Sequence, residues 1–220
     1  MFSALILTAG VALLFGYLFS LWYAKDPNRA AGMINLILAI SGIGTVVVML
    51  IMNFASLKNG KGVKVGFYVF AGLMGITLST LTIYTQNTPI LGIAFGLTSL
   101  IFAAMWGIAA IGKEKLAPLA VVGLGLLSGA LLVSLFTWIV ALIIRPTQST
   151  LTLLWVLDFV IFGAIMLITI VDMARIQTIL KQANVSDNTA IFCACTLYID
   201  FIYIFVRLAY FLIILTAQNK

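Results

Sequence analysis

The chain contains no histidine and very little charge. Only 8% of its 220 residues are Asp, Glu, Lys or Arg, and 64% are hydrophobic, whereas about 25% of a soluble domain is charged. This balance excludes a water-soluble fold, because no soluble core could hold so much apolar sequence. The lack of histidine removes the commonest transition-metal ligand and the usual proton carrier near neutral pH. We therefore expect any metal site to use oxygen ligands and no cofactor to be bound.

Cysteine is scarce too, and no basic run is found. Cys193 and Cys195 lie two positions apart in an apolar stretch, about 200° apart around a helix. They cannot face one another, so we expect reduced thiols. The net charge of +6 is spread through short segments rather than gathered in one run. Membrane topology explains this charge better than binding to nucleic acid does.

What the chain has instead is a series of long apolar runs. A bilayer span needs about 20 mostly apolar residues, and charges, prolines and polar clusters separate such runs. Spans are predicted at residues 2–22, 31–57, 65–86, 89–112, 116–144, 151–177 and 190–216. The first run lacks the basic start of a secretory signal, so we expect it to remain as a span. The predicted fold is an all-α membrane protein with seven transmembrane helices in one domain, residues 1–220.

The charges between the spans predict an orientation. One side would hold Lys58, Lys61, Lys64, Lys113, Lys115 and Lys181, and the other Lys25, Arg29, Arg145 and Lys220. Because cytoplasmic loops carry an excess of Lys and Arg, the N-terminus is predicted to be cytoplasmic and the C-terminus external. The expected location is a bacterial cell (inner) membrane.

Two glycine pairs, Gly92/Gly96 and Gly125/Gly129, have the GxxxG spacing. Small residues at this spacing let membrane helices approach closely, so we interpret both pairs as helix-packing sites without chemistry.

Ionisable residues inside spans are the strongest functional signal, because each costs at least about 2.5–3.5 kcal/mol at the membrane centre. Four residues qualify, all in the last two spans: Asp158, Asp172, Asp200 and Arg207. The last span also carries a polar stripe at helical spacing, formed by Cys193, Thr196, Asp200, Tyr203, Arg207 and Tyr210. Lipid cannot solvate this stripe. It predicts a central seventh helix whose polar groups are either satisfied by neighbouring helices or line an ion path.

The sixth span places Arg175 three residues after Asp172, within reach along one helix face. Because the last span returns from the same side, Asp172 and Asp200 are expected to converge in the cytoplasmic half. Asp158 is expected to be interfacial or locally paired. The third span adds a small and polar face suited to packing against the central helix, made of Tyr68, Gly72, Gly75, Ser79, Thr82 and Gln86.

Several short motifs resemble those of the Bax inhibitor family of seven-span proteins. The sequence LYIDFI at 197–202, followed by Phe205 and a nearby arginine, is similar to the signature of its seventh helix. IVDMARI at 170–176 resembles its sixth-helix aspartate motif, GITLS at 75–79 its third-helix motif, and KEK at 113–115 its charged turn. Tyr203 stands where the family often has asparagine, and the second span has no embedded arginine.

The resemblance implies a central seventh helix wrapped by six others, and a cation leak, chiefly for calcium, controlled by two aspartates. Asp172 and Asp200 occupy those positions and would be the metal-binding pair. Tyr203, Arg207 and Arg175 would join them in gating or lining the path. With no histidine, the aspartates are also the expected pH sensor, since coupled carboxylates can share a proton. The expected partners are calcium ions, protons and the lipid bilayer, and no enzyme activity is expected.

Two other functions stay open. A membrane protein that conducts nothing and serves only structure or partner binding would show the same hydropathy. An intramembrane aspartyl protease also places one aspartate in each of its sixth and seventh helices, although its second lies in a Gly-x-Gly-Asp sequence that Tyr198-Ile199-Asp200 does not match. A retinal photoreceptor is excluded because no span interior contains the lysine that it needs.

Overall fold

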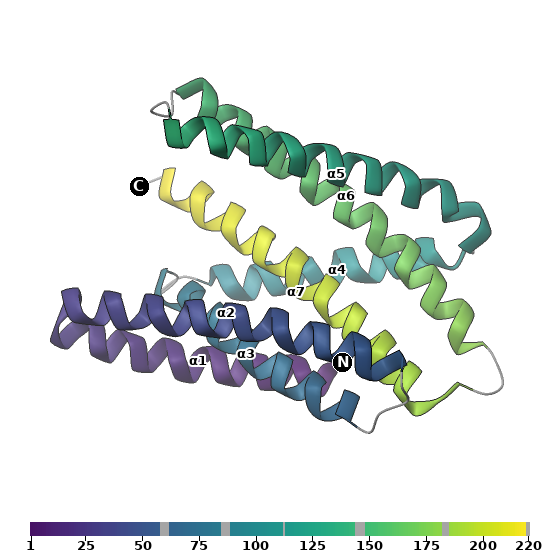
Figure 1. Cartoon of the computed structure of the whole chain (residues 1–220), viewed down its shortest axis with the longest axis horizontal. Helices are drawn as coiled ribbons and strands as arrows, with labels where there is room; N and C mark the ends of the chain where they lie inside the picture. Colours follow the sequence, from purple (N-terminus) through teal and green to yellow (C-terminus); the bar gives the residue numbers. More distant parts are fainter. Residues whose placement is uncertain (58–61, 85–88, 112, 144–147, 182–184, 219–220) are drawn as a thin grey trace. The chain divides into compact units, whose positions relative to one another are not determined.

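The computed structural model describes residues 1–57, 62–84, 89–111, 113–143, 148–181 and 185–218. Within these ranges every element is a helix and no strand occurs (Figure 1). The helices are α1 (Phe2–Lys25), α2 (Pro27–Leu57), α3 (Gly62–Tyr84), α4 (Ile90–Ala109), α5 (Lys113–Ile143), α6 (Gln148–Leu180) and α7 (Asp187–Gln218). All seven are long and apolar enough to cross a membrane. The predicted all-α, seven-span fold class is confirmed.

Several helices extend beyond the predicted apolar runs, because polar residues cap them. Only Asp26 separates α1 from α2, and its Oδ1 accepts a hydrogen bond from the Arg29 backbone N–H at 3.2 Å. Pro27 then occupies the first helical position, where its missing N–H costs nothing. Ser186 caps α7 in the same way, with its Oγ accepting from the Thr189 N–H at 3.2 Å. Both caps lie in polar segments that hydropathy assigns to loops.

The chain divides into two compact units. The first contains Met1–Thr98 and Asn184–Lys220, and the second contains Ser99–Ala183. The first unit therefore holds α1, α2, α3, the start of α4 and α7, whereas the second holds the rest of α4 with α5 and α6. That residues 1–220 form one domain, and that α7 is wrapped by all six other helices, remain predictions.

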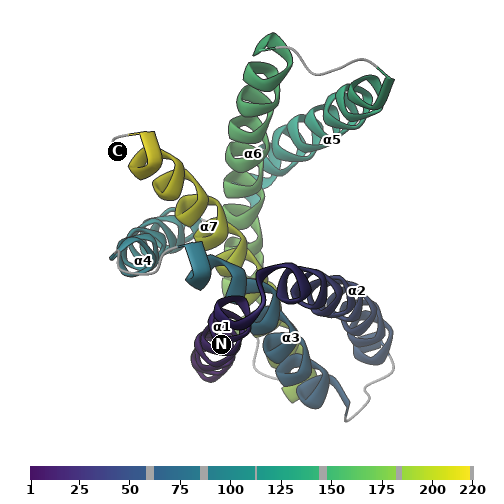
Figure 2. The same cartoon turned by 90° about the vertical axis from the view of Figure 1, so that its left-hand side faces the viewer.

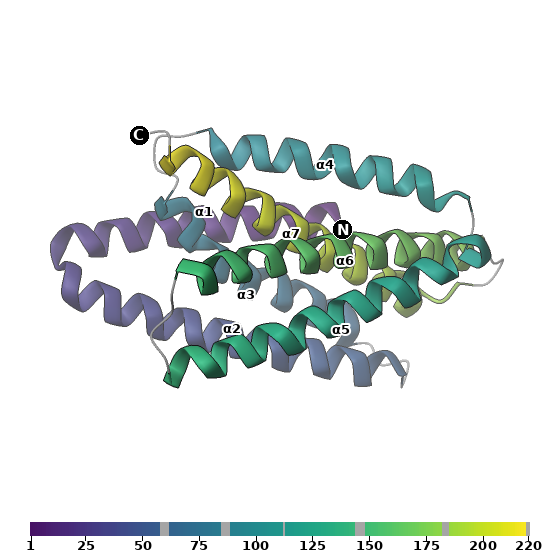
Figure 3. The ribbon, with the colours of Figure 1, turned by 90° about the horizontal axis from the view of Figure 1, so that it is seen from above.

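In the first unit, α1 and α2 form a hairpin that packs on α3 (Figures 2 and 3). Apart from Phe19, the buried face of α1 consists of small residues four positions apart, namely Ala4, Thr8, Ala12 and Gly16. A methyl group at Gly75 of α3 would lie 2.7 Å from both the Thr8 carbonyl oxygen and the Val11 Cβ. The two helices therefore meet backbone to backbone, as small residues at this spacing allow.

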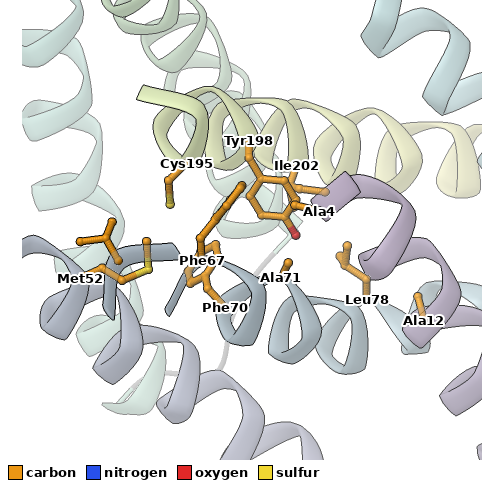
Figure 4. Packing of buried hydrophobic residues seen from close by; sticks show 11 residues of the cluster. Ala4, Ala12, Met52, Phe67, Phe70, Ala71, Leu78, Cys195, Tyr198 and Ile202 are labelled. Atoms are coloured by element: carbon orange, nitrogen blue, oxygen red, sulfur yellow. The ribbon is translucent and has the colours of Figure 1, made fainter. Parts of the chain in front are cut away.

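The last helix packs on α3 through aromatic side chains (Figure 4). Tyr198 is fully buried, and its ring meets Phe67 and Phe70 edge-on, with centroids 5.5 Å and 5.9 Å away. Two residues of the small and polar face of α3 serve other contacts: Gly75 meets α1, and the Tyr68 hydroxyl is 3.0 Å from that of Ser3. The expectation that this face packs against the seventh helix is wrong for these two residues. The side chains of Thr82 and Gln86 lie outside the described residues.

In the second unit, α5 and α6 lie side by side (Figure 1). A methyl group at Gly123 of α5 would lie 3.2 Å from the Ala164 carbonyl oxygen and 3.0 Å from Ile168 Cγ1. The Gln177 side-chain amide of α6 donates to the Trp106 carbonyl oxygen of α4 at 3.0 Å. A close glycine crossing and this hydrogen bond both connect helices of the second unit, in addition to its apolar contacts.

The predicted GxxxG packing sites are not used within either unit. Methyl groups added at Gly92, Gly96, Gly125 or Gly129 would meet no atom of the described residues within 4 Å. Close approach instead uses Gly66, Gly75 and Gly123. Spacing along one helix cannot reveal which face another helix covers, and this explains the difference.

Candidate functional site

Asp200 borders a cavity inside the first unit. The cavity has a volume of about 190 Å³ and lies between α2 and α7. Its lining consists of Met49, Met52, Phe192, Cys195, Thr196, Ile199 and Asp200. A water molecule takes about 30 Å³ in the liquid, so several waters or one hydrated cation fit. Among the described residues of this lining, Asp200 provides the carboxyl group.

The geometry of α7 explains why these side chains share one wall. Cys195, Thr196, Ile199 and Asp200 are spaced by one, three and one residues, and side chains four apart lie one above the other on a helix. The Thr196 hydroxyl donates to the Phe192 carbonyl oxygen at 3.2 Å. Its hydrogen is therefore used within the helix, and its oxygen remains an acceptor. The wall thus offers a cation oxygen atoms from Thr196 and Asp200, which lie on successive turns of α7.

Further along α7, Arg207 is held by Tyr203. The Arg207 Nε donates to the Tyr203 hydroxyl at 3.2 Å, and the guanidinium carbon lies 5.4 Å from the centroid of the same ring. Both side chains are half-buried. Tyr210, at the end of the predicted stripe, is 46% exposed. The other helices of this unit therefore do not cover the stripe as far as Tyr210.

A buried contact that the sequence analysis missed ties α1 to α7. Thr8 Oγ1 lies 2.6 Å from the Tyr198 hydroxyl, 2.8 Å from the Ala4 carbonyl oxygen and 3.1 Å from that of Ala71. The signal was present in the sequence: Thr8 interrupts the small-residue series of α1, while Tyr198 lies inside the aspartate motif. Tyr198 precedes Asp200 by two residues, so this contact fixes the rotation of α7 beside the cavity.

Asp172 belongs to α6 in the second unit. Its side chain is half-buried, and the two residues that follow it, Met173 and Ala174, are fully buried. Thr169, one turn earlier, is also fully buried, and its Oγ1 has no hydrogen-bond partner in the described part of the chain. Arg175 is exposed, and among the described residues no ion pair within 4.0 Å joins it to Asp172. The charge of Arg175 still acts on Asp172 along the helix, as their spacing predicted, without a direct ion pair.

The predicted site residues therefore fall into two groups. Asp200, Tyr203 and Arg207 lie on one helix of the first unit, and Asp172 and Arg175 lie on one helix of the second. Convergence of Asp172 with Asp200 stays a prediction. Asp158, the other carboxylate of α6, is half-buried. In the described ranges, no three His, Cys, Asp or Glu side chains are grouped so that they could hold a metal ion, so a preformed carboxylate cage does not occur there.

A second cavity in the first unit has a different character. Its volume is about 210 Å³, and its lining includes Leu78, Leu81, Phe95, Phe201 and Phe205. Thr8 contributes the one polar side chain of this lining, and its hydroxyl is already hydrogen-bonded. A bare or hydrated cation would lose water here without gaining ligands. Of these two cavities, the one beside Asp200 is therefore the candidate ion site.

The helices and the polar residues of the last span define an integral multi-pass membrane protein with an acidic cavity in its first unit. Its family follows from sequence comparison: the model described as "Inhibitor of apoptosis-promoting Bax1" matches residues 1–219, and the chain belongs to this Bax inhibitor-1 family. The resemblance inferred from the short motifs is thus confirmed over nearly the whole chain. A search among curated proteins gives no match.

Proposed function

We propose that the protein is a calcium-permeable leak channel or transporter, sensitive to pH and gated by Asp172 and Asp200. The observation that carries this proposal is the position of Asp200. This residue lies on α7, a helix long enough to span the membrane, and its carboxylate lines a cavity. An ionisable group at such a position is costly, so it generally marks an ion path or proton relay. Membership of the Bax inhibitor-1 family supports the same function.

Calcium is the proposed ion because hard carboxylate oxygens suit it. Calcium takes six to eight oxygen ligands, and two carboxylates cannot supply that number. Water and backbone carbonyl oxygens must complete the shell, so binding is weak and transient, as passage through a leak requires. Arg207, held by Tyr203, would repel cations that move along α7 and so restrict flux while the path is closed.

The pH response is proposed to come from the two aspartates acting as a coupled pair. Protonation favours closure, whereas deprotonation separates the helices by repulsion or recruits a cation between the carboxylates. On the described lining of the cavity, Cys195 is the other ionisable group. Tyr203 and Arg207 lie further along α7, and Arg175 follows Asp172 on α6.

Calcium flux into proteoliposomes tests this function. We expect the Asp200→Asn and Asp172→Asn variants each to lower flux at least about tenfold, which corresponds to roughly 1.4 kcal/mol in the barrier. Asp158→Asn is the matched control, because it removes a carboxylate from the same helix as Asp172 and should leave flux intact. Unchanged flux in the Asp172→Asn/Asp200→Asn double variant would remove the aspartates from this role. A wild-type protein that neither passes nor binds calcium would favour a purely structural function.

A further inference from the structure

We propose that the cavity beside Asp200 is also a site for a soft monovalent metal ion of the Cu(I) type, held by the sulfur atoms of Met49, Met52 and Cys195. The Asp200 carboxylate lies on the same lining. This site was not foreseen from the sequence, where the lack of histidine led us to expect only oxygen ligands. It does not rest on calcium conduction.

The fold brings three sulfur-bearing side chains to one cavity from two helices. Met49 and Met52 are three residues apart, so they share one face of α2, and Cys195 faces the same cavity from α7. Met52 and Cys195 are only 3% and 5% exposed, whereas Met49 is 43% exposed. In Figure 4, Cys195 extends from α7 toward the side on which Met52 lies.

The position of Met52 is set by the backbone of α3. A methyl group at Gly66 would lie 2.7 Å from Met52 Cγ and 3.3 Å from its Sδ. The absence of a side chain at Gly66 therefore provides the room that the thioether occupies. Because this neighbour is backbone, the thioether is held at the cavity wall.

The chemistry of the lining favours a soft ion. Thioether and thiolate ligands select Cu(I), whereas calcium and magnesium require oxygen. On binding, the S–H bond of Cys195 breaks, a sulfur–metal bond forms and the proton leaves to water. The product, one monovalent cation on one thiolate with two neutral thioethers, carries no net charge. A neutral complex is far less costly inside an apolar helix bundle than an unpaired ion.

Competition for Cu(I) tests the site directly. The purified full chain in detergent is titrated anaerobically with Cu(I) in the presence of bicinchoninate, a coloured Cu(I) chelator. We expect the wild type to withdraw one equivalent, and the Met49→Leu/Met52→Leu and Cys195→Ser variants to bind at least about tenfold more weakly. Leucine and methionine have similar volumes, so the double variant should keep its fold, and thermal unfolding verifies this.

Cys193→Ser is the matched control. Cys193 is as buried as Cys195, with 6% exposure, but does not line the cavity. Cu(I) affinity should therefore survive this change. The proposal is overturned if the wild type withdraws no Cu(I), if Cys193→Ser weakens binding as much as Cys195→Ser, or if the methionine variant binds like the wild type. Because the readout is binding in detergent, none of these results depends on whether the protein conducts calcium.

Discussion

At the residue scale, the neighbours of Thr8 determine which hydroxyl group donates in its hydrogen bond with Tyr198. A threonine hydroxyl has one hydrogen to donate, and Thr8 Oγ1 lies near two carbonyl oxygens, those of Ala4 and Ala71. If Thr8 donates to either carbonyl, the Tyr198 hydroxyl must donate to Thr8 at 2.6 Å. The first and last helices are thereby linked by an O–H donor that lipid could not satisfy.

We predict that Thr8 and Tyr198 are energetically coupled. A double-mutant cycle with Thr8→Val and Tyr198→Phe should give a coupling energy of about 0.6–1.7 kcal/mol, between the average and the maximum found for hydrogen bonds between membrane helices. The free energy of unfolding in mixed detergent micelles is the measurement. Thr45→Val is the control, because the Thr45 hydroxyl donates to the Ser41 carbonyl oxygen of its own helix. A cycle of Thr45→Val with Tyr198→Phe should show no coupling, and equal coupling in both cycles would contradict the prediction.

The carboxylates give a second prediction at this scale, which concerns pH. In the wild type, calcium flux should fall as the pH is lowered, because protonation of the aspartates favours closure. Asn imitates a protonated carboxyl group, so Asp172→Asn and Asp200→Asn should each flatten or shift this profile. Flux into proteoliposomes at stepped pH is the readout, with Asp158→Asn expected to keep the wild-type profile. A midpoint and amplitude that persist in both single variants would contradict the prediction.

At the scale of elements, the α1–α3 contact depends on small residues. Ala4, Thr8, Ala12 and Gly16 form the buried face of α1, apart from Phe19. Gly75 meets this face so closely that a methyl group would overlap the Thr8 carbonyl oxygen. Van der Waals contact between backbones therefore replaces the hydrophobic driving force that is absent within a bilayer.

We predict that Gly75→Ala destabilises the protein by about 1–3 kcal/mol, the usual cost of forcing extra volume into a packed contact. Gly72→Ala, on the same helix, is the matched control. A methyl group there would meet no atom of the described residues within 4 Å, so Gly72→Ala should not destabilise the protein. Unfolding in mixed micelles again provides the measurement. Alanine has a higher helix propensity than glycine, so similar losses in both variants could not come from propensity and would contradict the packing argument.

Helix boundaries show how local polar residues alter an expectation based on hydropathy. The seventh span was predicted to begin at residue 190, but α7 begins at Asp187 behind the Ser186 cap. Residues 23–30 were predicted to separate the first two spans, yet Asp26 alone separates α1 from α2. Side-chain caps satisfy the free N–H groups at the start of a helix, so the helices continue through residues that hydropathy counts as loop.

At the scale of the whole molecule, we predict a cytoplasmic N-terminus. Single cysteines at Lys25 and Lys64, both exposed, are introduced in a Cys193→Ser/Cys195→Ser background. An impermeant maleimide should label the Lys25→Cys variant in intact cells and the Lys64→Cys variant only after permeabilisation. The reverse pattern would invert the orientation. Labelling of both variants from outside would contradict a crossing by α2, which separates the two positions.

The sequence by itself determined the class of this protein: seven apolar runs, confirmed as helices, and a family identity visible in short motifs and confirmed over residues 1–219. It also located the ionisable residues, since charge within a span is costly wherever it occurs. These properties depend on composition and local order, so no knowledge of packing was needed.

Only the tertiary structure decided which faces meet. Within the two units it showed close approach at Gly66, Gly75 and Gly123 rather than at the expected glycine pairs, and it placed Asp200 at a cavity with Met49, Met52 and Cys195. In a sequence where nearly every face of every helix is apolar, hydrophobicity cannot distinguish a lipid-facing side from a buried one. That choice depends on shape, on where a missing side chain lets backbones approach, and shape exists only once the helices have packed.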